Sequence, residues 1–139
     1  MQAPTRWLTV VVAIAALGGC GTIKNQQSLL DNTLETYASV IRWGNFEEAI
    51  TFVDPATLKD HPITPLDLQR YQQVRVTGYL EQPARHISEN EVRQTVEIGL
   101  VNINTQAARA IIDTQTWRFD PAAKHWWLVS GLPNITATQ

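Results

Sequence analysis

The sequence is poor in cysteine and in clustered positive charge. It contains one cysteine in 139 residues, so no disulfide bond can form within the chain. Its 11 Lys and Arg are scattered among 13 Asp and Glu, for a formal net charge of −2. A nucleic-acid surface needs clustered Lys and Arg, so this composition argues against a nucleic-acid partner.

Catalytic and cofactor signatures are also missing from the sequence. It has no phosphate-binding glycine-rich loop and no nucleophile elbow around a serine. Its three histidines, His61, His86 and His125, lie on different expected elements, without the spacing of metal ligands. We therefore predict no catalytic residue from a motif, no cofactor and no metal site.

Long hydrophobic runs are absent as well. The longest apolar run, Trp7 to Gly19, holds 13 residues, whereas a membrane-spanning helix needs roughly 20. It follows the segment MQAPTR, which carries Arg6, and it ends in small residues. This order of a positive region, a short apolar region and small residues is typical of a secretory signal peptide.

The run ends at Leu17-Gly18-Gly19-Cys20, which resembles the lipobox of bacterial lipoproteins. The resemblance implies cleavage before Cys20, a diacylglycerol on its sulfur and attachment to a membrane. Gly21 follows the cysteine in place of the Asp that favours inner-membrane retention, which implies the periplasmic face of the outer membrane. We predict a signal peptide over residues 1–19, and a lipidated Cys20 followed by a polar tether over 20–27. The part of the tether after the cysteine, residues 21–27, reaches at most ~25 Å when extended.

The first half of the mature chain predicts helices. Four apolar residues at helical spacing predict a first helix, begun by a weak capping box at Ser28 and Asp31 and ended at Gly44. The four residues are Leu30, Leu34, Tyr37 and Ile41.

Two further helices are expected before the strands. Asn45 and Glu48 form a capping pattern for the second helix, which Asp54-Pro55 ends and a short turn follows. Thr64-Pro65 opens a third helix through about Gln73.

The second half predicts strands, because β-branched and aromatic residues alternate between turn clusters. The expected strands are residues 75–82, 91–101, 108–119 and 125–130. Short connections favour antiparallel neighbours. The predicted fold class is therefore α+β, with N-terminal helices packed on one face of a curved four-stranded antiparallel sheet.

Two stretches of the chain carry a family resemblance, YASVIRWGNFEEAITFVDP at 37–55 and WRFDPAAKHWWLVSGLP at 117–133. Together with the order of the expected helices and strands, they are similar to the nuclear-transport-factor-2-like superfamily. The resemblance covers residues 28–133 and leaves 134–139 as a C-terminal tail. It implies a cone-shaped sheet whose open end can hold a small ligand. Enzymes of that family use an Asp or an Asp–His pair inside the cone, and many members have no chemistry.

The register of the middle hairpin decides whether this chain places charged groups inside the cone. A two-residue turn at Asn104-Thr105 pairs Ile98 with Ile111 and Val92 with Trp117, and puts Arg109 and Asp113 on the apolar inner face. A turn of odd length reverses the faces and leaves both charges in water. We favour the second alternative, because Arg and Asp on a strand surface are ordinary.

The last hairpin is expected to turn over Asp120–Ala123, which pairs Trp117 with Trp126. An aromatic cross-strand pair stabilises a hairpin by about 0.5–1 kcal/mol. The adjacent Trp126 and Trp127 must point to opposite faces, so one of them lies off the main core. A ligand platform could use the tryptophans Trp43, Trp117, Trp126 and Trp127, although buried aromatic residues usually form core.

The sequence therefore predicts a non-catalytic, membrane-anchored envelope lipoprotein that binds a protein partner or an envelope component. The alternative is an acid–base enzyme or carrier for a small apolar ligand, with Asp113 as base and Arg109 as charge partner. The candidate pocket for that alternative comprises Arg109, Asp113, Trp117 and Trp126.

Overall fold

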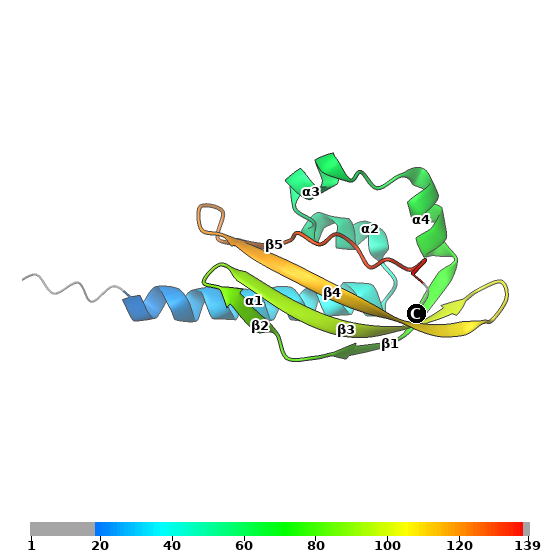
Figure 1. Cartoon of the computed structure of the whole chain (residues 1–139), viewed down its shortest axis with the longest axis horizontal. Coiled ribbons are helices and arrows are strands. Elements are labelled where there is room, and N and C mark those ends of the chain that lie inside the picture. Colours follow the sequence, from blue (N-terminus) through cyan, green and yellow to red (C-terminus); the bar gives the residue numbers. More distant parts are fainter. Residues whose placement is uncertain (1–18, 138–139) are drawn as a thin grey trace, which may run out of the picture.

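A computed structural model describes residues 19–137, and it has an α+β fold (Figure 1). The elements are α1 (Gly19–Arg42), α2 (Phe46–Ala49), the 3-10 turn η1 (Ile50–Phe52), α3 (Pro55–Asp60), α4 (Pro65–Gln72), β1 (Val74–Glu81), β2 (Arg85–Ser88), β3 (Glu91–Asn102), β4 (Ala108–Asp120) and β5 (His125–Leu128). The long helix α1 packs on a strongly curled antiparallel sheet, which confirms the predicted fold class. Within 19–137, no helix is both long and apolar enough to cross a membrane.

Helix α1 begins earlier than the sequence pattern suggested. It starts at Gly19, so residues 21–27 are helical rather than an extended tether, and the expected capping box at Ser28 does not form. Ser28 Oγ instead donates to the carbonyl of Lys24 within the helix, at 3.0 Å. The predicted signal peptide, apart from Gly19, lies outside the described residues, as do 138–139 of the tail.

Tertiary contacts hold this N-terminal part of α1 against the sheet. The Gln26 side-chain amide donates to the carbonyl of Glu89 and to Asn90 Oδ1, in the turn between β2 and β3. Trp126 Nε1 on β5 donates to the carbonyl of Gln26 at 3.2 Å. A polar segment is therefore helical because two distant hairpins bind it.

The end of α1 and the start of α2 follow the predicted pattern. Gly44 has φ of +70°, its N–H donates to the carbonyl of Ile41, and the Asn45 N–H donates to that of Val40. These are the two bonds of a Schellman motif, which favours glycine at this position. Asn45 then caps α2 by accepting from the Glu48 N–H at 3.1 Å.

Helices α3 and α4 both begin at a proline. Asp54 caps α3 through the Ala56 N–H, so the expected turn after Asp54-Pro55 is a short helix, because proline suits the first helical position. Helix α4 begins at Thr64-Pro65, where the third helix was predicted, and Thr64 and Asp67 form a capping box there that was not predicted.

The sheet follows the order β1-β3-β4-β5, with every pair antiparallel. The short strand β2 pairs with the other end of β3, on the same side as β1. Its residues lie in the segment expected to be a turn, and Pro83, which has no N–H to donate, stands in the gap between β1 and β2. The predicted four-stranded path is confirmed, and β2 was missed.

The β3–β4 pairing decides which side chains lie under α1. Ile98 pairs with Ile111 and Val92 with Trp117, so the favoured odd-length turn was wrong and the inner-face register is the observed one. The connection is wider than the two-residue turn, since the Asn102 N–H donates to Ala107 and the Gln106 N–H to Asn102. Because its length is even, the inner face is unchanged.

The register of the last hairpin, β4 with β5, is shifted by two residues from the predicted one. Trp117 pairs with Leu128 and Phe119 with Trp126, so the expected Trp117–Trp126 pair does not form. A shift of two preserves the side-chain alternation. Trp117, Trp126 and Leu128 therefore all remain in the core, and Trp127 is the half-exposed member of the tryptophan pair.

Candidate functional site

A polar cluster lies on the inner face of the sheet, beneath α1. Asp113 and Gln115 are buried there on β4, Gln94 on β3 and Tyr79 on β1. Each occupies an inward position of its strand, between apolar neighbours such as Val96 and Trp117. Buried polar groups are costly unless they are hydrogen-bonded, so their partners determine what this cluster can do.

Gln115 is the centre of the hydrogen bonds. Its amide nitrogen donates to Asp113 Oδ2 at 2.9 Å and to the Tyr79 hydroxyl at 3.0 Å. Its amide oxygen accepts from Trp117 Nε1 at 3.2 Å. A fully buried glutamine thus joins a carboxylate, a phenol and an indole.

Few interactions offset the cost of burying the charged Asp113 carboxylate. Its side chain accepts from Gln115, and no positively charged group forms an ion pair with it among residues 21–137. Burial raises the pKa of Asp113 to about 6, although the Gln115 hydrogen bond acts in the opposite direction. A carboxyl group with such a pKa can exchange a proton near neutral pH.

Tyrosines from three elements surround this carboxylate. Burial, with the nearby Asp113 charge, raises the pKa of Tyr37 on α1 well above its usual value. Burial likewise raises the pKa values of Tyr71 on α4 and Tyr79 to about 12, with Asp113 again contributing. All three phenols therefore remain protonated and can act as hydrogen-bond donors.

Tyr37 stands apart because its hydroxyl is buried without a hydrogen-bond partner among the described residues. Its ring packs edge-on against Trp117, with centroids 5.1 Å apart. The hydroxyl is a donor available to a polar group that reached the interior.

The four residues of the predicted pocket do not come together around one cavity. Arg109 is exposed, and its guanidinium donates to the carbonyls of Ile135 and Ala137 rather than to Asp113. Trp126 is buried and bonded to α1. Trp117, through Gln115, is the one predicted residue linked to Asp113.

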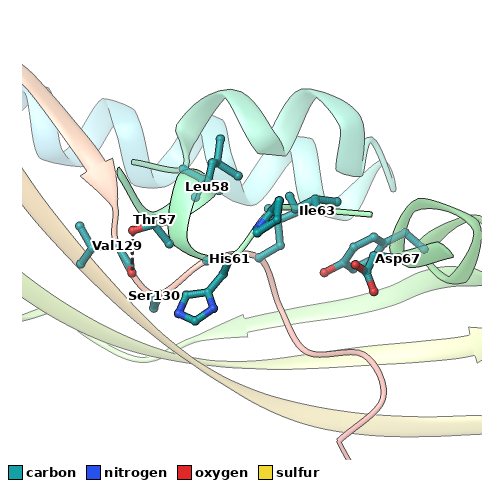
Figure 2. Close-up of a pocket in the computed structure, with 12 residues that line it drawn as sticks. Thr57, Leu58, His61, Ile63, Asp67, Val129 and Ser130 are labelled. Atoms are coloured by element: carbon teal, nitrogen blue, oxygen red, sulfur yellow. Dashed lines mark hydrogen bonds between the residues drawn. The ribbon is translucent and has the colours of Figure 1, made fainter. Parts of the chain in front are cut away.

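One concavity lies elsewhere, between the α3–α4 connection and the chain after β5 (Figure 2). It encloses about 470 Å³ and is half-open to solvent. Figure 2 shows Thr57 and Val129 at one end and Asp67 at the other. Asp67 is bonded to Thr64 and Arg70, and Ser130 Oγ accepts from the Thr116 N–H.

His61 also lines this concavity. No hydrogen bond joins His61, Asp67 and Ser130 among the described residues, so the three do not form a nucleophile–base–acid relay. The lining of the concavity mixes polar and apolar side chains.

A second concavity of about 400 Å³ lies between the end of α1 and β1, lined by Arg42, Trp43, Val76, Thr77, Gly78 and Tyr79. Trp43 is 85% exposed. The Arg42 guanidinium lies 5.1 Å from the centre of the Tyr79 ring, a cation–π distance that holds this side chain beside the groove. Neither concavity is lined by Arg109, Asp113, Trp117 or Trp126.

Metal binding finds no support within the described residues, where no three His, Cys, Asp or Glu side chains converge. His86 contacts Gln27, and the His125 ring packs on Trp127.

Sequence reasoning missed Gln115, Gln94 and Tyr79. The available signal was their position: each follows the same alternation as the buried apolar residues of its strand once the register is known.

No protein-family model matches the chain, and no curated protein matches it. The fold and the cluster define an α+β protein with a curled sheet, a buried carboxylate and several surface concavities.

Proposed function

We propose that the protein is a lipid-anchored binding module of the bacterial cell envelope, attached through Cys20 at the periplasmic face of the outer membrane. The observation that carries the proposal is the lone cysteine at the end of the short apolar run, in the order Leu17-Gly18-Gly19-Cys20. Two or more acyl chains on one residue hold a protein firmly, without a spanning helix.

The described fold is compatible with such an anchor. Helix α1 begins next to Cys20 and is bound to the sheet from Gln26 onward. At the 1.5 Å rise of an α-helix, Cys20 and Gln26 are roughly 9 Å apart along the axis. Lipid on Cys20 would therefore hold the domain close to the bilayer, with the β2–β3 turn and the β4–β5 loop at the same end as the start of α1 (Figure 1).

We further propose that residues 28–133 belong to the nuclear-transport-factor-2-like superfamily. The support is the succession of N-terminal helices and a curled antiparallel sheet, with the inner face of the sheet against α1.

The anchor is tested with a Cys20→Ser variant expressed in its native envelope. We expect the wild-type protein to fractionate with membranes and to carry acyl chains on an N-terminal Cys20 by mass spectrometry. The variant should be recovered in the soluble fraction. A wild-type N-terminus at Met1, or a variant that still fractionates with membranes after signal removal, would refute the anchor.

Binding is tested by crosslinking in intact envelopes. If the protein is a non-catalytic binding module, the same envelope component should be crosslinked to it in repeated experiments. The crosslinked product should be absent from cells in which the protein is deleted. Recovery of no partner would count against this part of the proposal.

One observation favours a second candidate, an acid–base enzyme or carrier for a small apolar ligand. Asp113 is a buried carboxylate with a pKa of about 6, and the nearby Tyr37 hydroxyl has no hydrogen-bond partner among residues 21–137. This candidate uses Asp113 and Tyr37 and leaves Arg109 out. Native mass spectrometry of protein purified from its envelope should then detect a bound small molecule that Asp113→Asn loses. A wild-type protein without adduct, or an adduct that the variant retains, would reject it.

A further inference from the structure

Strand β1 forms one border of the sheet, and its outer side is not paired with any described strand. In Figure 1 it runs along the lower margin of the molecule. Exposed strand edges offer unpaired N–H and C=O groups to another chain. The question is which of these groups face outward and what could bind them.

The ladder to β3 identifies the outward groups. Just beyond β1, the Gln82 N–H donates to the Thr95 carbonyl at 2.9 Å. Hydrogen-bonded and non-hydrogen-bonded pairs alternate along an antiparallel ladder, so Gly78 and Leu80 bond to β3. The backbone groups of Tyr79 and Glu81 therefore point away from β3, toward the open edge.

The same reasoning applies before the bulge at Thr77. The Ile103 N–H donates to the Gln73 carbonyl, so the backbone groups of Val74 and Val76 face outward. The outward groups of Val76 and Tyr79 belong to residues that line the groove beside Arg42 and Trp43. The edge and the groove thus form one surface.

The side chains around this surface indicate the chemistry of its occupant. Trp43 is exposed and offers a large apolar face, the residue type most often dominant in binding energy. Arg42 carries the one formal charge among the groove residues, and no acidic residue lines the groove. A complementary segment supplies a carboxylate for Arg42 and an apolar side chain for Trp43.

A second copy of this chain fits the surface less well. Two β1 strands paired about Gly78 would bring their Arg42 side chains to the same face of the joined sheet, where like charges repel. The charge of the groove therefore selects a different, acidic partner.

We infer that the open edge of β1 and the Arg42–Trp43 groove bind an extended, acidic and apolar peptide segment of a partner protein, which adds as a further strand to the sheet. Backbone pairing supplies affinity, and the groove selects alternate side chains. This inference rests on the proposed binding function and names the class of partner. The proposed anchor enters only in stating how far from the membrane the peptide binds. From Cys20 to Arg42 the helix is roughly 33 Å long, so the segment binds at the end of α1 opposite the anchor.

The test uses the full chain, purified in detergent micelles, and a phage-displayed library of random peptides. We expect enrichment, over empty micelles, of peptides in which an acidic residue accompanies alternating apolar ones. On addition of an enriched synthetic peptide, hydrogen exchange should slow in residues 74–81. No enrichment, or slowed exchange elsewhere and not in β1, would overturn the inference.

Matched variants separate backbone pairing from charge. Glu81→Pro removes an outward N–H at an edge position where proline is tolerated, and it should abolish binding, whereas Glu81→Gln, which loses the same charge, should retain it. Trp43→Ala should weaken binding about tenfold, whereas Ile23→Ala, an exposed apolar residue at the other end of α1, should not.

Equal binding by Glu81→Pro and wild type would overturn strand addition. If Glu81→Pro does not fold by circular dichroism, the exchange pattern of the wild-type protein decides. Concentration-dependent dimers in sedimentation that Trp43→Ala abolishes would overturn the assignment in favour of self-pairing.

The anchor can fail independently of this inference. Cys20→Ser should release the protein from membranes without changing peptide affinity, and Trp43→Ala should change affinity without changing membrane fractionation.

Discussion

The replacement Asp113→Asn tests the interior cluster most directly. Asparagine has nearly the same shape as aspartate, and its side-chain oxygen can accept the hydrogen bond that Gln115 Nε2 now donates to Asp113. The variant therefore removes the charge while leaving the contacts in place. Its effect on folding stability should follow the ionisation of one carboxyl group.

The magnitude comes from the pKa in the folded state. Burial raises the pKa of Asp113 from 3.8 to about 6, which disfavours the ionised carboxylate in the folded protein. The folded state binds the proton more tightly than the unfolded state, so this group's favourable contribution is fully present below pH 3.8 and is lost as pH rises through about 6. At 1.36 kcal/mol per pKa unit, the charged group costs about 3 kcal/mol at pH 8 and about 1 kcal/mol at pH 4.5.

Urea unfolding of both proteins at the two pH values measures this cost. We expect Asp113→Asn to be more stable than wild type at pH 8 by about 3 kcal/mol, and the advantage to narrow by about 2 kcal/mol at pH 4.5. Asp60→Asn is the matched control, because Asp60 is exposed and its side chain makes no hydrogen bond among the described residues. Its free energy of unfolding should stay within about 0.5 kcal/mol of the wild-type value, as is usual for a surface substitution.

Two results would refute the reasoning. If wild type is as stable as Asp113→Asn at pH 8, the carboxylate is compensated by a contact that the cluster does not contain. If the difference does not narrow at low pH, Asp113 does not titrate in this range.

Two further changes test other parts of the fold by the same unfolding measurement. Tyr37→Phe removes a buried hydroxyl that has no hydrogen-bond partner in the described part of the chain, and it should stabilise the protein by about 1 kcal/mol. A loss of stability would mean that the hydroxyl is hydrogen-bonded. Thr64→Ala removes the capping box of α4 and should destabilise the protein by about 1 kcal/mol. The control Thr36→Ala changes an exposed threonine within α1 and should have a smaller effect. Equal losses of stability in the two variants would argue against the cap.

Local patterns predicted several elements well. Gly44, Asn45 and Thr64 act through bonds that span only a few residues, so their turns and caps follow from the sequence itself. The strands β3 and β4 were also predicted within a residue of their ends, because their alternation of apolar and polar residues is long.

Features that depend on distant residues were predicted poorly. The first turns of α1 are polar and carry no helical pattern, yet Gln26 is bound by Asn90 and Trp126, which lie 64 and 100 residues further along the chain. Strand β2 carries no apolar alternation of its own and exists because β3 extends past the end of β1. Contacts between residues far apart in the chain produce no pattern in the local sequence, so they could not be predicted from it.

The candidate site shows the same division. Arg109 and Asp113 were grouped because they share one strand face, and in the structure they do share it, but Arg109 reaches the chain after β5 instead. The partner that Asp113 does have, Gln115, lies two residues away on the same face and was overlooked as an ordinary polar residue.

By itself the sequence determined the fold class, the end of α1, the start of α2, the bounds of α4 and the alternation along the long strands, because these depend on backbone preferences and on neighbours a few residues apart. It also determined the short apolar run that ends at Cys20. Only the tertiary structure decided that Asp113 faces the interior and that β1 is an open edge. Both depend on how strands separated by a turn are aligned, and alternation along one strand is equally compatible with either alignment.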